Sequence, residues 1–154
     1  MRNKKNLIIG IFLFYYTVNF IDRIKKVLTK IYIPVAWTLV IIILLSIPGS
    51  MLPNEQGFSI PDFDKFVHIV LFGVLVFLWC FYFNSKKYPL KKLMLLFFLT
   101  FLFSNALGIG MEFVQKYWIP FRDYSEGDII ADMIGAGFSY GICNIWLIGE
   151  KNSR

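Results

Sequence analysis

Four long apolar runs, separated by short polar segments, dominate the chain. They cover residues 31–47, 66–83, 93–111 and 129–148, so each contains 17 to 20 residues. A helix needs about 20 apolar residues, with roughly 17 as the lower limit, to cross the hydrocarbon core of a bilayer. The pattern therefore predicts an all-α fold: an integral membrane helical bundle with four transmembrane helices.

The segments between these runs differ in charge. Residues 22–30 and 84–92 each carry four basic side chains, whereas residues 48–63 carry none and residues 112–128 carry only Lys116 and Arg122. Basic loops stay on the cytoplasmic side of a membrane. We therefore expect the first two segments in the cytoplasm and the other two outside, and four spans then return the C-terminus to the cytoplasm.

A further apolar run, residues 7–21, is short for a span and has basic residues on both sides. It lacks the small-residue cleavage site of a signal peptide. Two interpretations stay open, a helix on the inner leaflet and a fifth span. The expected organisation is an N-terminal extension (1–30), a membrane domain (31–148) and a cytoplasmic tail (149–154).

The composition agrees with a membrane protein, since 57% of the residues are hydrophobic and the formal net charge is +6. The basic residues lie in blocks beside the apolar runs, a placement typical of contact with anionic lipid headgroups. We therefore expect the lipid bilayer as a partner and no nucleic acid. Cys80 and Cys143 both lie inside apolar runs without metal-ligand spacing, so we interpret them as small buried hydrophobic residues.

Strongly polar residues gather at the ends of three runs, on the side that the topology places outside. Ionisable groups in membrane segments are costly and commonly mark function. Asp64 and His68 are four residues apart, one turn on one helical face, so Asp64 is predicted to orient His68. The other candidates on this side are Lys65, Glu112, Gln115, Arg122, Asp128 and Asp132.

Some of these residues also fit purely structural roles. Ser125 and Asp128 match a capping box at the start of the last helix, and Glu112 has the spacing to pair weakly with Lys116 on a solvated turn. Asp132 lies one turn deeper than Asp128, where a carboxylate needs a cation, a hydrogen-bond donor or a proton. The candidate partners of Asp132 are Arg122, Lys65 and His68.

Small residues recur at four-residue spacing in the third and fourth runs, and such stripes let membrane helices approach closely. The stripes are Ser104/Gly108, Ala106/Gly110, Ala131/Gly135/Ser139 and Gly137/Gly141. We expect these two helices to pack through them, which would hold the acidic residues of the last run beside Glu112.

Several short motifs follow one another along the chain, each occurring once. They are Asp64-Lys65-Phe66-Val67-His68 with Phe72, then Glu112-Phe113-Val114-Gln115, Arg122, and Asp128-x-x-x-Asp132-x-x-Gly135. In order and spacing they resemble the VanZ-like membrane protein family, over about residues 33–148. The resemblance implies a small polytopic protein of the bacterial inner membrane, in a family named for a member associated with resistance to the antibiotic teicoplanin.

This chain departs from the family pattern at two places. The family often has Asn where this chain has Asp132, and the extra acid favours a shared proton or a bound cation. The resistance-associated member lacks the Asp-Lys-x-x-His form found here, so the resemblance does not carry the drug phenotype over to this protein.

Three functions follow as hypotheses. The first is recognition or modification, at the extracytoplasmic face, of a cell-envelope lipid, a lipid-linked precursor or a lipid-tailed glycopeptide, with binding through Lys65, Gln115, Arg122 and Asp128. The second is a membrane-embedded enzyme, either acid–base or metal-dependent, with catalytic roles for His68, Asp64, Glu112 and Asp132. The third is a structural protein whose ion network serves assembly alone. The sequence specifies no cofactor.

Overall fold

The computed structural model describes the backbone of residues 2–51 and 63–149, with side chains from residue 15 onward. Within these residues the regular structure is entirely helical, which confirms the predicted all-α bundle. A 3-10 turn, Gly49–Met51, follows the second helix, and a π-helical turn, Asn144–Ile148, extends the last. The α-helices are α1 (Arg2–Leu28), α2 (Tyr32–Leu45), α3 (Phe63–Asn84), α4 (Leu90–Trp118) and α5 (Glu126–Cys143). The predicted tail beyond Gly149 lies outside the described residues.

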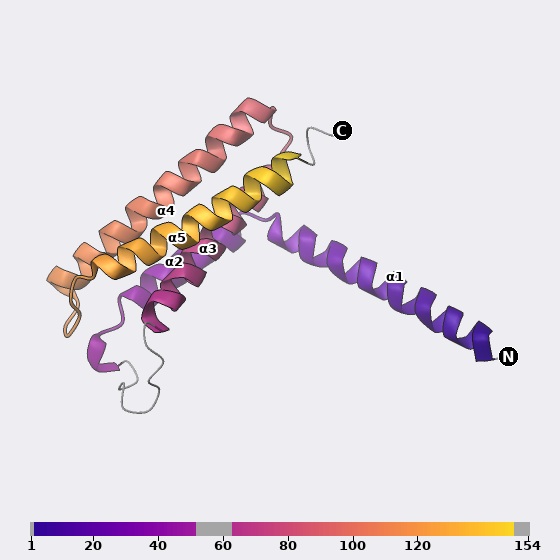
Figure 1. Ribbon diagram of the computed structural model, residues 1–154, viewed down its shortest axis with the longest axis horizontal. Coiled ribbons are helices and arrows are strands. Elements are labelled where there is room, and N and C mark those ends of the chain that lie inside the picture. The colour runs from indigo at the N-terminus through magenta and orange to yellow at the C-terminus, as the bar shows by residue number, and fades with distance from the viewer. Residues whose placement is uncertain (1, 52–62, 150–154) are drawn as a thin grey trace.

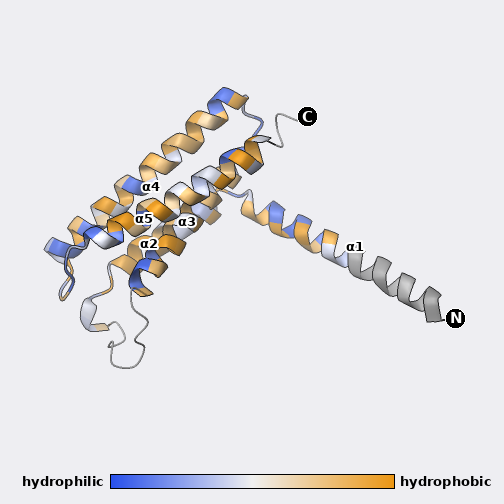
Figure 2. Ribbon diagram, in the orientation of Figure 1, coloured by the Kyte–Doolittle hydropathy of each residue, from blue (hydrophilic) through white to orange (hydrophobic). Residues whose placement is uncertain are grey.

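Helices α2 to α5 lie alongside one another in a bundle, and α1 extends away from it (Figure 1). Helices α3 and α4, and α5 continued to Ile148, are each long and apolar enough to cross a membrane. Hydrophobic residues predominate along these helices, with hydrophilic ones mainly towards their ends (Figure 2), and large side chains such as Phe103, Phe138 and Ile145 are exposed on them. Exposed apolar surface of this extent fits contact with lipid, and the chain is a multi-pass membrane protein.

Helix α2 is shorter than the predicted first span, residues 31–47. Its 14 residues give a length of about 21 Å, against a hydrocarbon core of about 30 Å. The helix is limited by a turn at residues 29–31 and by Pro48, which follows its C-terminal turn. Helix α2 has the apolar length of a span only together with residues Tyr15–Leu28 of α1, from which it is bent by 68°. The bundle thus has three spans, or four if this bent pair crosses the membrane as one.

Helices α3 and α5 make the most extensive contact in the bundle, and small residues permit it. A side chain on Gly135 would collide with the backbone carbonyl of Ile69. A side chain on Gly73 would press on the Gly135 carbonyl and the Ser139 hydroxyl, at 3.3 and 3.4 Å. The predicted stripe Ala131/Gly135/Ser139 is therefore confirmed as a packing surface, although its closest partner is α3 rather than α4.

The four predicted stripes do not all face a neighbouring helix. Ser104 and Gly108 are buried, and Gly108 lies against Asp132 of α5. Ala106 is exposed and a Cβ on Gly110 would have no atom within 4 Å, so the stripe Ala106/Gly110 was predicted wrongly. The stripe Gly137/Gly141 is confirmed only in part, because a Cβ on Gly137 would lie 3.9 Å from the Phe101 ring of α4, whereas one on Gly141 would have no atom within 4 Å. Two residues further along a helix turn the side chain by about 200°, and that rotation carries Gly110 and Gly141 away from the contact.

Two apolar clusters fill the interior of the bundle one after the other. Ile41, Phe72 and Met111 belong to the first, while Cys80 and Cys143 belong to the second, near the C-terminal end of α3. Both cysteines are free and buried, in line with the sequence interpretation. The remaining end of the bundle, where α3 begins, α4 ends and α5 begins, is the end that holds the polar residues.

Candidate functional site

Four ionisable side chains from three helices meet inside this end of the bundle. His68 comes from α3, Glu112 from α4, and Asp128 and Asp132 from α5. Their exposed fractions are only 3%, 0%, 7% and 1%, so all four are buried. His68, Glu112 and Asp128 each offer a ligand atom, and these three atoms lie within 4.8 Å of one another. The convergence expected from the sequence is therefore present for these four residues.

The imidazole of His68 is fixed by a carboxylate on α5. Its Nδ1 lies 2.8 Å from Oδ1 of Asp132, and its ring lies parallel to that of Phe72, with centroids 6.4 Å apart. Gly108 of α4 makes room for this pair, because a side chain there would overlap the Asp132 carboxylate. With Nδ1 engaged, Nε2 is the ring nitrogen left for chemistry.

Asp64, the predicted partner of His68, is exposed at the start of α3. The expectation that Asp64 orients His68 is therefore corrected: Asp132 does so. The spacing of four residues does put Asp64 near the same helical face, but Asp64 lies one turn further out. There the carboxylate keeps its water, while His68 is turned into the bundle and is reached from α5.

Glu112 is bound to the start of α5. Its Oε2 accepts a hydrogen bond from the backbone N–H of Ser125 at 2.9 Å. The Ser125 hydroxyl in turn accepts from the N–H of Asp128 at 3.2 Å, which confirms the predicted helix cap. Lys116 lies near the rings of Tyr117 and Tyr124, at 5.5 Å from each centroid, rather than pairing with Glu112. Glu112 thus joins α4 to α5 in the interior, and the solvated-pair alternative is wrong.

Gln115, predicted as a ligand-binding residue, is buried in a contact with α2. Its amide nitrogen donates to the backbone carbonyl of Leu45 at 2.9 Å. Nearby, the N–H of Gly49 donates to the carbonyl of Pro120 at 3.1 Å, so the segments after α2 and α4 are also joined. The Gln115 side chain therefore holds α2 against α4 next to the cluster.

The two predicted cations lie in segments that flank the cluster, Lys65 in the first turn of α3 and Arg122 between α4 and α5. The aliphatic stem of Lys65 passes over Gly127 in the first turn of α5, where a side chain on Gly127 would meet Cε of Lys65. Arg122 is half-buried in the segment between α4 and α5. Among the described residues no ion pair joins Arg122 to the acidic side chains; the partner of Asp132 is His68.

Three carboxylate oxygens of the cluster have no hydrogen-bond partner among the described residues: Glu112 Oε1, Asp128 Oδ1 and Asp132 Oδ2. A buried polar atom without a partner costs free energy, and native proteins keep few of them. Three within one cluster, together with an imidazole nitrogen that Asp132 does not occupy, indicate a site that binds something else. Sequence reasoning missed the role of Gly108 here, since spacing marks it only as a packing residue.

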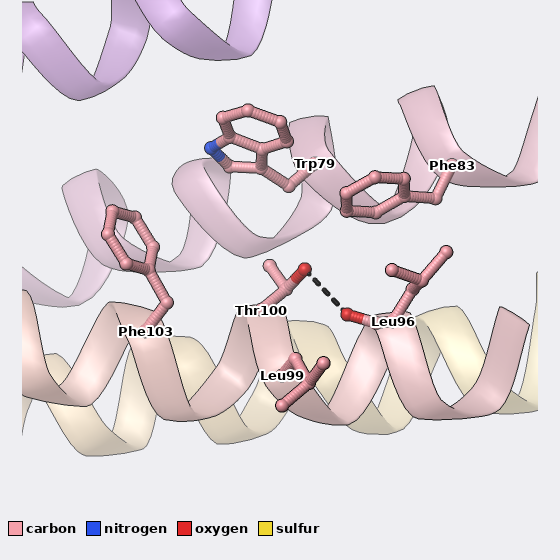
Figure 3. Close-up of a pocket in the computed structure, with 6 residues that line it drawn as sticks. All are labelled: Trp79, Phe83, Leu96, Leu99, Thr100 and Phe103. Carbon is pink, nitrogen blue, oxygen red and sulfur yellow. Dashed lines mark hydrogen bonds between the residues drawn. The ribbon is translucent and has the colours of Figure 1, made fainter. Parts of the chain in front are cut away.

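A separate hollow lies between α3 and α4 (Figure 3). Its volume is about 260 Å³, and Figure 3 shows its lining by Trp79, Phe83, Leu96, Leu99, Thr100 and Phe103. Its one drawn hydrogen bond runs from the Thr100 hydroxyl to the carbonyl of Leu96, at 2.8 Å. The lining residues nearest the cluster are Trp79, 11 residues beyond His68 on α3, and Phe103, nine residues before Glu112 on α4, or about 16 and 14 Å along the helices. The hollow is apolar and separate from the cluster, so the candidate site is the polar cluster.

Comparisons of this chain with protein-family models, with curated proteins and with solved structures gave no match.

Proposed function

We propose that this chain is a VanZ-like protein of the bacterial inner membrane that modifies the polar headgroup of an envelope amphiphile at the extracytoplasmic face. The amphiphile would be a cell-envelope lipid, a lipid-linked precursor or a lipid-tailed glycopeptide. The single observation that carries the proposal is the meeting of His68, Glu112 and Asp128 within 4.8 Å at one end of the bundle. These residues belong to the motifs on which the family resemblance rests.

The charge distribution supports the outward orientation of the site. Four lysines lie in the link between α3 and α4 and in the first turn of α4, namely Lys86, Lys87, Lys91 and Lys92, and basic segments of this kind favour the cytoplasm. The cluster lies at the opposite end of both helices. Trp118 and Phe121 are 72% and 83% exposed at that end, and aromatic residues with such exposure commonly lie at the headgroup level of a membrane.

Chemistry is favoured over recognition alone because of the His68–Asp132 pair. A carboxylate that accepts from Nδ1 fixes the imidazole tautomer and raises the basicity of Nε2, the arrangement that a general base requires. An Nε2 prepared in this way can take a proton from water or from a hydroxyl of the headgroup, or it can bind a metal ion that activates the water in its place. Lys65, whose stem lies over Gly127, and Arg122, in the segment before α5, would hold phosphate or carboxylate groups of the amphiphile.

The assembly-only alternative fits the geometry less well. A closed ion network would pair its buried oxygens, because an unpaired buried charge is strongly destabilising. Glu112, Asp128 and Asp132 each keep one oxygen without a partner among the described residues. The cluster is therefore polar beyond what joining the helices requires.

The test compares a bacterial strain that lacks the protein with strains complemented by wild type, by His68→Gln and by Glu126→Gln. Glu126 is an exposed acid at the start of α5 and serves as the matched control. We expect envelope-lipid composition, or susceptibility to lipid-tailed glycopeptides, to change in the deletion strain. Wild type and Glu126→Gln should restore it, and His68→Gln should not, at equal abundance in the membrane. No change in either measurement on deletion, or full restoration by His68→Gln, would refute the proposal.

A further inference from the structure

We infer that His68, Glu112 and Asp128 form a binding site for one divalent transition-metal cation, with Asp132 orienting the imidazole from behind. The inference deepens the proposed function and rests on the same site, since it names what completes that site. It is tested by metal binding itself, so the two proposals can fail separately.

The three donor atoms lie close enough together to bind one ion. The ligand atoms of His68, Glu112 and Asp128 lie within 4.8 Å of one another. Metal–nitrogen and metal–oxygen bonds to Zn²⁺ are about 2.0–2.2 Å long, so tetrahedral ligands of one ion lie about 3.4 Å apart. The most separated donor atoms therefore need to close by up to about 1.4 Å, on the order of the displacement of a mobile side chain.

Two carboxylate oxygens without partners among the described residues, Glu112 Oε1 and Asp128 Oδ1, indicate a bound ligand independently of these distances. Glu112 is fully buried and Asp128 is 7% exposed, and each keeps one carboxylate oxygen without a hydrogen-bond partner among the described residues. The other oxygen of Glu112 is occupied by the N–H of Ser125. That bond fixes the carboxylate and leaves Oε1 for a ligand. A cation would satisfy both free oxygens at once.

A hydrogen bond to Asp132 and one from the Ser125 N–H hold two of the proposed metal ligands in place. A metal-bound histidine almost always gives its other ring N–H to a carboxylate, which fixes the ring and strengthens the metal bond. The bond between Nδ1 of His68 and Oδ1 of Asp132, at 2.8 Å, has this form. The Ser125 N–H plays the corresponding part for Glu112. The three proposed donors come from α3, α4 and α5, so one ion would join all three spans.

The donor set also limits the kind of metal. Carboxylates alone would suit Mg²⁺ or Ca²⁺, whereas an imidazole nitrogen favours transition metals. One imidazole with two carboxylates fits Zn²⁺ or Mn²⁺, and leaves room for a bound water. Such a water is a nucleophile at neutral pH when the metal lowers its pKa, and it would supply the attacking oxygen for a headgroup hydrolysis.

The experiment uses the full chain purified in detergent with an affinity tag that contains no histidine, because His68 is the only histidine in the sequence. The protein is stripped with a chelator and then titrated separately with Zn²⁺ and with Mn²⁺. We expect one ion per chain, with binding at least about tenfold weaker in Glu112→Gln, as for removal of a metal contact, and unchanged in the control Glu126→Gln.

A spectroscopic measurement on wild type avoids dependence on variants that fold poorly. In the Mn²⁺-loaded protein, pulsed electron paramagnetic resonance should detect coupling to an imidazole nitrogen, which only His68 can supply. Coupling should disappear in His68→Gln. Failure of wild type to bind either ion stoichiometrically would overturn the inference. Bound Mn²⁺ without nitrogen coupling, or equal affinity in Glu112→Gln and Glu126→Gln, would show adventitious binding and would overturn it as well. Metal binding without any change in envelope chemistry would leave the inference standing and remove the proposed function.

Discussion

The two ends of the bundle are built on the same three helices, yet they differ in how completely their interiors are satisfied. At the end near Cys80 and Cys143, side chains such as Val76, Leu93 and Phe97 are fully buried against other apolar groups. At the end near His68, the interior holds four ionisable groups and three carboxylate oxygens without partners among the described residues. The first end contributes packing, and the second carries polar groups that packing does not explain. Substitutions should therefore separate stability from function along the length of the bundle.

The largest loss of stability is expected at the close contact between α3 and α5, on which both ends of the bundle depend. Gly135→Leu places a side chain against the backbone of Ile69, which cannot move without separating α3 from α5. We expect a loss of more than about 3 kcal/mol, beyond ordinary overpacking, and low yield of folded protein. Thermal unfolding in detergent measures it. Gly141→Leu is the control, since a Cβ at that position would meet no atom within 4 Å; equal melting temperatures for the two variants would contradict the packing described.

The apolar end should lose stability without losing function. Phe97→Ala removes a fully buried ring. Lipid is as apolar as this interior, so the loss is mainly of packing contacts, roughly 2 kcal/mol rather than the about 3–5 kcal/mol of a water-soluble core. Phe98→Ala, at a neighbouring position that is 45% exposed, should change the melting temperature little. Complementation by Phe97→Ala at matched abundance should equal wild type, and a clear defect there would show that function extends to this end.

Gly108→Ala should reduce both the stability of the protein and its affinity for the metal, each to an intermediate degree. The added methyl group would lie 2.5 Å from Oδ2 of Asp132, so the carboxylate must move and the bond to His68 is strained. We expect about 1–2 kcal/mol of destabilisation and at least tenfold weaker metal binding. Gly110→Ala, which points into open space, is the matched control. Identical binding by both variants would mean that the position of Asp132 does not matter.

Asp132→Asn should have the smallest effect on stability and the clearest effect on metal binding. Asp132→Asn keeps an acceptor for His68 and removes one buried charge, so the change in stability should stay within about 1 kcal/mol. Metal affinity should fall about 10- to 100-fold. Asp64→Asn, at the exposed position first expected to orient His68, should bind metal as wild type does. A reversed result, with Asp64→Asn the weaker binder, would restore the sequence-based pairing.

The sequence predicted the class of fold well because the need to hide apolar side chains and satisfy the backbone in lipid leaves few solutions. The apolar runs at residues 66–83, 93–111 and 129–148 each fall within a helix or its π-helical extension. It also predicted that His68, Glu112, Asp128 and Asp132 share one end. Run lengths did not reveal that α2 stops at 14 residues, since apolar content alone marks neither the turn at residues 29–31 nor the bend between α1 and α2.

The pairing of His68 with Asp132 could not be predicted from the sequence, and the reason is physical. Spacing along one helix relates Asp64 to His68, but the bond that forms depends on how α5 is rotated against α3. That rotation is set by Gly73 and Gly135, where the backbones approach closely. Likewise, spacing alone gives two equivalent small-residue stripes on α4, and only the packed structure distinguishes Gly108 from Gly110.

The shortness of α2 has a consequence for the lipid around the protein. Helix α2 ends at Leu45, level with Gln115 of α4, while α4 continues to Trp118. A membrane relieves such a mismatch in hydrophobic length by thinning locally. Phospholipids beside the C-terminal end of α2 should therefore sit lower than elsewhere around the bundle. Under the proposed function, an amphiphile would then reach the buried carboxylates sideways from the adjacent leaflet, without first leaving the bilayer.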